Sequence, residues 1–164
     1  MVRLVPMTED EYRDYMSSAV GEYAQEVAQA NDWPIERALQ VAEEQFRELL
    51  PQGLSTLHHR FLVIEESAPP AGRVGMLWFA VEHKGPKPHA FLYDFRIDEA
   101  FRRRGYGTQA LQALEVQVRK LGLDTITLHV FGHNSAARAL YKKMGYAEVD
   151  LIMSKMLDEE KDAT

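Results

Sequence analysis

The stretch from Phe91 to Thr108, which reads FLYDFRIDEAFRRRGYGT, restricts the fold of this chain more than any other segment. From Phe91 to Ile97, aromatic and branched side chains alternate with others, which is typical of a β-strand. The alternation predicts one face with Phe91, Tyr93, Phe95 and Ile97 and another with Leu92, Asp94 and Arg96. After Gly107, apolar residues recur every three or four positions, which predicts a helix. An arginine- and glycine-rich loop therefore joins a strand to a helix.

The loop from Arg102 to Thr108 has the chemistry of an anion-binding site. Backbone N–H groups at a helix N-terminus, together with the positive end of the helix dipole, attract phosphate groups. Gly105 and Gly107 allow a tight turn without a Cβ atom, and the three arginines add positive charge. A solvated basic turn explains the arginines equally well, but it does not explain two glycines at the start of a helix.

The glycine spacing also matches the dinucleotide-binding pattern G-x-G-x-x-G/A, from Gly105 to Ala110. That pattern requires glycines directly after a buried strand and a carboxylate at the end of the next strand. Here a charged turn separates strand and glycines, and Asp124 precedes the next predicted strand. No Gly-Lys-Ser/Thr follows the glycines, so a Walker loop is excluded.

A second motif strengthens the interpretation of the loop. The segment Asn134–Tyr146 reads NSAARALYKKMGY and fits the pattern Asn-x-x-Ala-x-x-Leu-Tyr followed by Gly-Phe/Tyr. Together with Arg102-x-x-Gly105-x-Gly107, it resembles the two acetyl-CoA motifs of the GNAT superfamily of N-acetyltransferases, in the family's order. The resemblance covers about Arg60 to Met156 and extends to the YycN-like bacterial branch.

The resemblance implies an α/β GNAT fold, with a mixed, mostly antiparallel central sheet of about six or seven strands flanked by about four helices. We expect one domain from residue 1 to residue 157 and a charged tail from residue 158 to residue 164. Hydrophobic patterns and helix-start signals predict further elements around the strand and helix of the opening stretch. They are a strand at Val2–Val5, helices starting near Thr8 and Pro34, strands at Phe61–Glu66, Arg73–Glu82 and Thr125–Phe131, and a final hairpin within Ala147–Leu157.

The resemblance also implies a cofactor site. The pyrophosphate of acetyl-CoA would be held by the loop residues Arg102, Arg103, Arg104, Gly105, Tyr106, Gly107 and Thr108. Main-chain groups of Phe95 and Ile97 would pair with the pantetheine arm in the manner of an added strand. Asn134, Ala137 and Tyr141 of the second motif would complete the site. By residue type alone, Asn134 is equally a helix N-cap.

Two residues are catalytic candidates. Tyr141 matches the tyrosine that, in the family, points at the thioester sulfur and can act as general acid. Asp94 lies on the strand beside the expected thioester and can accept the proton of the amine. Alternatively, Tyr141 is a core residue and Asp94 pairs with Arg96 on the same strand face. Tyr93, Glu82 and the histidines remain open as bases.

Composition excludes several other classes of protein. The chain of 164 residues has no cysteine, so thiolate zinc sites and cysteine nucleophiles are excluded, and the spacing of its six histidines does not suggest a metal site. A net charge of −6 argues against nucleic acid as a partner. No long apolar run or signal peptide is visible, so we expect a cytoplasmic protein without membrane contact.

The expected activity is direct transfer of an acetyl group from acetyl-CoA to the primary amine of a small molecule or peptide, without a metal. One alternative is a non-catalytic module that binds acyl-CoA, and another is a protein N-terminal acetyltransferase. As members of this superfamily often dimerise, a homodimer is compatible with the sequence.

Overall fold

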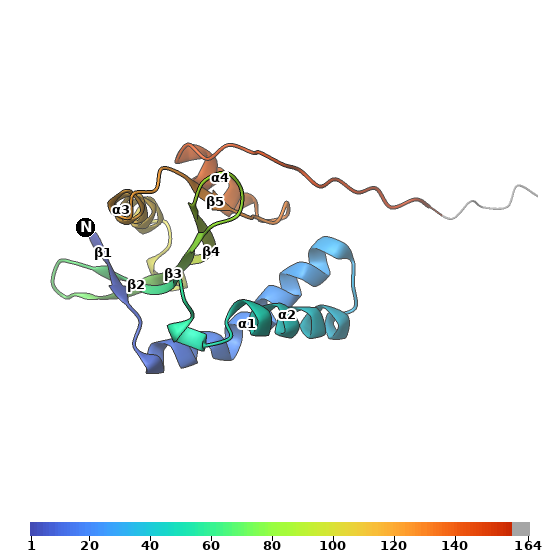
Figure 1. Ribbon diagram of the computed structural model, residues 1–164, viewed down its shortest axis with the longest axis horizontal. Helices are drawn as coiled ribbons and strands as arrows, with labels where there is room; N and C mark the ends of the chain where they lie inside the picture. The colour runs from blue at the N-terminus through green and yellow to red at the C-terminus, as the bar shows by residue number, and fades with distance from the viewer. Residues whose placement is uncertain (159–164) are drawn as a thin grey trace, which may run out of the picture.

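The computed structural model describes residues 1–158 and contains a single five-stranded sheet. The strands are β1 (Val2–Pro6), β2 (His59–Glu66), β3 (Gly72–Glu82), β4 (His89–Ile97) and β5 (Ile126–Leu128). They lie side by side in sequence order, antiparallel except for the parallel pair β4 and β5 (Figure 1). The predicted mixed, mostly antiparallel sheet is therefore confirmed, although the expected number of strands, about six or seven, is too high.

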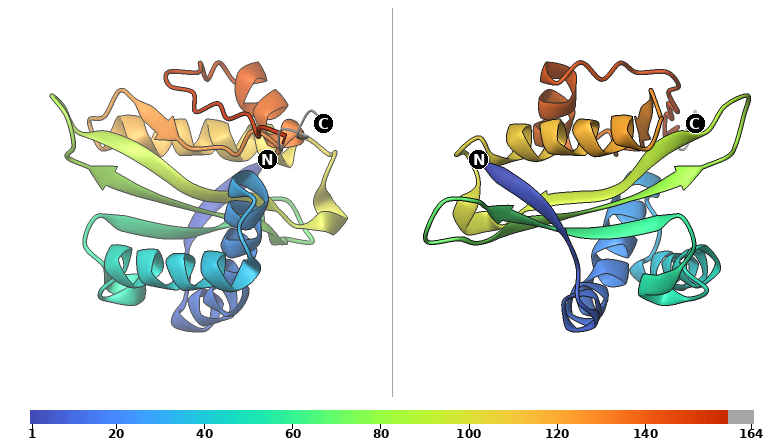
Figure 2. Two further views of the ribbon diagram at one scale, coloured as in Figure 1. Left: turned by 90° about the vertical axis from the view of Figure 1, so that its right-hand side faces the viewer. Right: turned by 60° about the vertical axis from the view of Figure 1, so that its left-hand side comes forward.

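Helices cover both faces of the sheet, as Figure 2 shows. The four helices are α1 (Glu9–Asn31), α2 (Ile35–Leu49), α3 (Tyr106–Lys120) and α4 (Ser135–Lys143), and the short 3-10 turns are η1 (Gly53–Ser55) and η2 (Glu99–Phe101). On one face, α1 and α2 enclose an aromatic core around Phe61 and Trp78. On the other face, Leu111 and Leu114 of α3 pack on Phe79 of β3.

Local sequence signals fix the start of α1. Thr8 accepts the N–H of Glu11 through its hydroxyl at 3.2 Å, and the Glu11 carboxylate accepts the N–H of Thr8 at 2.8 Å. Thr8 and Glu11 thus form a capping box, in which each side chain satisfies a donor that the helix cannot, and the helix begins where the sequence predicts. The helix places Tyr15, with Tyr12 and Met16, against the sheet, and Tyr15 is only 5% exposed.

A β-bulge interrupts the alternation predicted for β4. Trp78 of β3 pairs with Asp94, but the next residue, Phe79, pairs with Leu92. Tyr93 is therefore the extra residue on β4, without an opposite partner on β3.

The bulge changes which side chains share a face. Leu92 packs with Phe95 and Ile97 in the core under α3, whereas Tyr93 packs in the core under α1. Asp94 also points to the α1 side, where it contacts Tyr15. The prediction that Tyr93 shares a face with Phe95, and Leu92 with Asp94, is therefore wrong, because the inserted residue shifts the alternation by one position. Phe95 and Ile97 share a face as predicted.

The final hairpin predicted within Ala147–Leu157 is absent from the described residues, where no strand follows α4. Every residue from Ala147 to Asp158 is exposed. The segment contains no Gly, Pro or Asn, and its only common turn residues are Asp150 and Ser154. The predicted charged tail lies, from residue 159 on, outside the described residues.

None of the helices within residues 1–158 combines the length and the apolar character that crossing a membrane requires.

Candidate functional site

The loop before α3 presents a row of backbone donors. Gly105 is the N-cap residue with φ of 82°, and Arg103 also has a positive φ, 65°. Residues of positive φ in a loop can turn neighbouring N–H groups toward one side, which is how anion-binding concavities form in other proteins. Within residues 1–158, no acceptor pairs with the N–H groups from Arg103 to Thr108. The first N–H of α3 with a backbone acceptor belongs to Gln109, which bonds the Gly105 carbonyl at 3.2 Å.

The two glycines of the loop serve different purposes. A Cβ atom on Gly105 would meet nothing within 4 Å, so this glycine is required by its positive φ alone. At Gly107 a Cβ atom would lie 3.1 Å from Leu140 Cδ2 and 3.7 Å from Phe95 Cζ. Gly107 therefore lets the start of α3 approach β4 and α4 closely.

The arginines of the loop are not equivalent. Arg102 donates Nε to the Ile97 carbonyl at 2.9 Å and so ties the loop to the end of β4. Arg103 and Arg104 are exposed, and the Arg104 guanidinium lies 5.8 Å from the centre of the Phe101 ring. Tyr106 lies toward β2, where a hydrogen bond to Glu66 raises the pKa of the tyrosine. All three arginines are exposed, but among the described residues only the Arg102 guanidinium makes a hydrogen bond within the chain.

The edge of β4 opens beside this loop. β5 pairs with β4 only from Ala90 to Leu92, while β4 continues to Ile97. The N–H of Asp98 bonds the Val74 carbonyl on the β3 side at 2.8 Å. Because main-chain groups of successive strand residues alternate in direction, those of Phe95 and Ile97 face the open side.

Two of the main-chain groups on the open side already make hydrogen bonds within the chain. The N–H of Phe95 donates to Asp94 Oδ1 at 2.9 Å, and the Ile97 carbonyl accepts from Arg102. The open edge of β4 and the donor row of the loop are adjacent, so an extended arm ending in phosphates would fit both.

Helix α4 borders the open edge. The Asn134 side chain caps the helix, since its Oδ1 accepts the N–H of Ala137 at 3.2 Å. The amide nitrogen of Asn134 remains as a donor. Asn134 therefore acts as the N-cap that its residue type allows, and its second polar group can still bind a ligand.

Tyr141 lies behind the open edge of β4. Its ring centre is 6.4 Å from that of Phe95 and 5.5 Å from that of Tyr146. Burial, followed by the negative charges of Asp94 and Glu26, raises the pKa of Tyr141, so its hydroxyl is protonated at neutral pH. The sequence predicts both Tyr141 and Asp94 as site residues, and the fold brings them near each other.

Asp94 is the centre of a polar network. Its Oδ2 accepts the Tyr15 hydroxyl at 2.6 Å and lies 3.3 Å from the Arg96 guanidinium, which in turn binds Glu22 at 2.6 Å. The predicted pairing of Asp94 with Arg96 is therefore confirmed. A carboxylate offers about four lone-pair sites, so three donors, including the N–H of Phe95, leave one for a ligand.

The sequence interpretation did not identify three polar residues of this network. Tyr15, Glu22 and Glu26 come from α1 and share one helix face, at spacings of seven and four residues. Burial is the main cause that raises the pKa of the Glu26 carboxyl, and the negative charge of Asp94 raises it further. His133 acts in the opposite direction and lowers this pKa. Two glutamates four residues apart, on the helix face that carries Tyr15, were the signal that could have revealed these residues.

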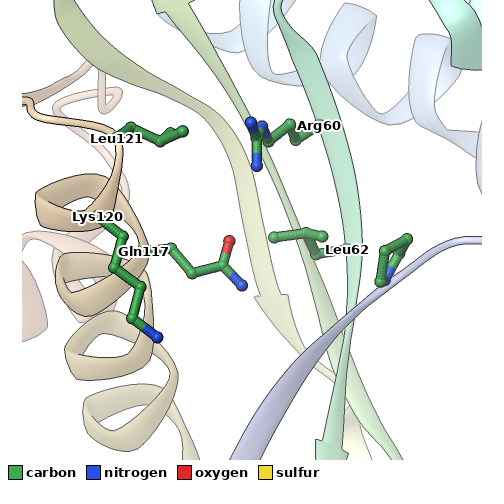
Figure 3. Close-up of a pocket in the computed structure, with 6 residues that line it drawn as sticks. Arg60, Leu62, Gln117, Lys120 and Leu121 are labelled. Carbon is green, nitrogen blue, oxygen red and sulfur yellow. The ribbon is translucent and has the colours of Figure 1, made fainter.

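Elsewhere the surface has a hollow of about 320 Å³ between β2 and the end of α3 (Figure 3). Its lining residues are Pro6, Arg60, Leu62, Gln117, Lys120 and Leu121. None of them belongs to the loop, to the open edge of β4 or to the Asp94 network. Among the described residues, no three histidine or carboxylate side chains gather as ligands for a metal ion.

Residues 10–146 match the model of the acetyltransferase (GNAT) family. The chain belongs to the GNAT family. It is 39% identical to the N-acetyltransferase YycN of Bacillus subtilis over 95% of this chain and 99% of that protein. It is also 34% identical to YdgE of the same organism, over 94% and 97% of the two chains. These likenesses place the chain in the YycN-like branch and support an acetyltransferase.

Solved structures agree with this assignment. The crystal structure of YycN from Bacillus subtilis matches with a TM-score of 0.89, covering 97% of this chain and all of that chain. AAC(6′)-Iy, solved in complex with the bisubstrate analogue CoA-S-monomethyl-acetylneamine, shares the fold at a TM-score of 0.57 and 14% identity, over 96% of this chain and 99% of that one.

Proposed function

We propose that this protein transfers the acetyl group of acetyl-CoA directly to the primary amine of a small molecule or peptide. The observation that carries the proposal is the row of N–H groups from Arg103 to Thr108 beside the open edge of β4. The loop suits the pyrophosphate, and Arg103 and Arg104 add positive charge. Phe95, Ile97 and the Asn134 amide suit the pantetheine arm.

In the proposed reaction, the neutral amine forms a bond to the acetyl carbon and the carbon–sulfur bond breaks. Tyr141 donates its proton to the departing thiolate, which gives free coenzyme A. The raised pKa of Tyr141 keeps its hydroxyl protonated at neutral pH, so a proton is present to donate, but it also makes the phenol a weaker acid than an ordinary tyrosine.

We assign the removal of the amine proton to Asp94, directly or through water. Its side chain is 32% exposed and retains one acceptor position. Glu26 is a second carboxylate for this role, because its raised pKa makes it a stronger base than an ordinary glutamate. The cluster of Asp94, Glu22 and Glu26 also gives the acceptor side a negative character that suits amines.

The cofactor site is tested with a matched pair of glycine variants. Gly105 and Gly122 have φ of 82° and 77°, and a Cβ atom on either one meets nothing within 4 Å. Alanine should therefore strain both positions equally, by about 1 kcal/mol. We expect Gly105→Ala to weaken acetyl-CoA binding at least about tenfold in calorimetry. Gly122→Ala, in the turn after α3, should leave acetyl-CoA affinity unchanged.

Turnover completes the test. The wild type should release free thiol from acetyl-CoA in the presence of at least one amine from a panel of polyamines, aminoglycosides, amino acids and peptides. Acetyl-CoA binding without turnover on any amine would favour the alternative of a non-catalytic module. Equal affinities of the two glycine variants would remove the loop from the cofactor site.

A further inference from the structure

The hollow between β2 and the end of α3 is bordered by polar side chains that have no partner in the described part of the chain. Arg60 of β2 and Gln117 of α3 extend into the space between the two elements, and Lys120 borders it on the helix side (Figure 3). Within residues 1–158, none of these three side chains makes an ion pair or a hydrogen bond. Two positive charges and one amide are therefore available to a ligand.

Apolar side chains make up the rest of the lining. Leu62 is only 4% exposed, whereas Leu121 is 36% exposed. Pro6, the last residue of β1, completes the apolar part. With about 320 Å³, the hollow is at the lower end of the size range of small-molecule sites. Such sites combine an apolar lining with a few polar groups, and this hollow has both.

A second hollow continues from the first around the end of β1. It has about 310 Å³ and shares Pro6, Arg60 and Leu62 with the first. Its other lining residues are mostly apolar, and they are Met7, Leu54, His59 and Phe61. Arg60 therefore borders both hollows, so a ligand held at this residue can place an apolar chain in either one.

The charges around the first hollow favour an anion. The protein has a net charge of −6, yet the carboxylates on and just after α3 already have other cations as partners. Glu115 binds Arg119 at 3.4 Å, and Asp124 binds Lys87 at 2.8 Å. The unpaired charges of the hollow are therefore both positive, and they attract a ligand of opposite charge.

The end of α3 limits how much negative charge this ligand can carry. Lys120 is the last residue of α3, where the helix dipole is negative. The N–H groups of Leu121, Gly122 and Leu123 are bonded to carbonyls of the helix, so they offer no row of donors to a phosphate. A carboxylate carries a single charge, and the arginine fork can bind both of its oxygens.

We propose that this hollow binds a small aliphatic carboxylate. Arg60, Lys120 and the Gln117 amide hold the carboxylate group, and the aliphatic tail covers the apolar side chains between β2 and α3. Because α3 has 15 residues and is about 22 Å long, this site is separate from the loop at the other end of the helix. The site is therefore independent of the proposed acetyl-CoA site.

The proposal is tested by titrating the full-length protein with hexanoate in two-dimensional NMR. The side-chain amide signal of Gln117 is assigned by its absence in Gln117→Leu. We expect this signal to shift and to saturate with a dissociation constant of about 1 mM, as befits so small a ligand. Without a saturable shift of the Gln117 signal, or with shifts only in the backbone amides from Arg103 to Thr108, the proposal is wrong.

Three comparison ligands separate the contributions of charge and tail. Acetate carries the charge without the tail, and hexanol carries the tail without the charge. Each should bind at least about fivefold more weakly than hexanoate. Inorganic phosphate should also bind more weakly. Equal binding of hexanol and hexanoate would remove the role of the cations, and tighter binding of phosphate would replace the carboxylate by a phosphate ligand.

A matched pair of double variants tests the residues. Arg60→Gln with Lys120→Gln should weaken hexanoate binding at least about fivefold. Arg13→Gln with Arg119→Gln removes the same two positive charges from exposed arginines that pair with carboxylates outside the hollow, and it should leave the affinity unchanged. Circular dichroism checks that both proteins fold. Equal affinities of the two double variants would refute the site, and the comparison of ligands on the wild type decides even if one variant does not fold.

Discussion

At the scale of single residues, Asp94 is the point where the parts of the site meet. It receives hydrogen bonds from Tyr15 on α1 and from the N–H of Phe95 on its own strand, and it pairs with Arg96. Arg96 is held in turn by Glu22. Because each partner fixes the next, the carboxylate keeps one orientation toward the open edge of β4.

Tyr141→Phe should separate catalysis from binding. The hydroxyl would stabilise charge that appears only as the thiolate leaves, so its loss should lower kcat without raising KM. We expect turnover to fall roughly 10²- to 10⁴-fold, the range for one general acid. Calorimetric affinity for acetyl-CoA should stay nearly unchanged, since phenylalanine keeps the ring against Phe95. Wild-type turnover in this variant would assign Tyr141 to packing alone.

The pH dependence of turnover should identify the base. Asp94→Asn should lower kcat/KM most at low pH and recover partly at high pH, where more of the amine is already neutral. Glu26 must be deprotonated to accept a proton, and burial raises its pKa. If Glu26 is the base instead, kcat/KM of the wild type should fall as the pH drops through that raised pKa, and Glu26→Gln should abolish this limb.

Glu22→Gln is the control for this pH experiment, because Glu22 binds Arg96 on the same helix face as Glu26. An acid limb that survives in Asp94→Asn and disappears in Glu26→Gln would transfer the role of base to Glu26.

At the scale of secondary-structure elements, the site depends on where pairing stops. The bulge at Tyr93 comes directly after the last residue of β4 that pairs with β5, Leu92. Beyond it the two parallel strands separate, and β4 has an unpaired edge up to Ile97. The hydrogen bond from Arg102 Nε to the Ile97 carbonyl then holds the loop at the end of β4. The row of N–H donors therefore begins next to the unpaired edge.

At the scale of the whole molecule, the proposed cofactor would connect elements from both motifs. The loop before α3, the end of β4 and the start of α4 lie far apart in sequence but border one open region. A ligand bound there would resist unfolding of the second half of the chain, because only the folded chain brings these parts together.

Coenzyme A should therefore raise the stability of the folded protein by about 2.7 kcal/mol at a hundred times its dissociation constant. A thermal melting experiment with and without coenzyme A measures the effect. NAD at the same concentration should give no shift, since its fingerprint is only formally present in Gly105 to Ala110. A shift with NAD and none with coenzyme A would favour a dinucleotide site.

The sequence by itself determined the features that depend on neighbours a few residues apart. The capping box of Thr8 and Glu11, the cap of α4 by Asn134 and the strand–loop–helix around Gly105 all follow from local hydrogen bonds and backbone preferences. The two motifs in their order were sufficient to predict the GNAT family, which the comparisons confirm.

Only the tertiary structure decided the features that depend on register and on helix packing. Tyr15 and Asp94 are 79 residues apart, and their hydrogen bond requires α1 to lie across β4. The bulge at Tyr93 arises from pairing with β3, which no pattern within β4 encodes. The segment Ala147–Leu157 is predicted from the sequence as a hairpin, yet within residues 1–158 no strand follows α4, because a local pattern does not determine whether a segment reaches a sheet edge.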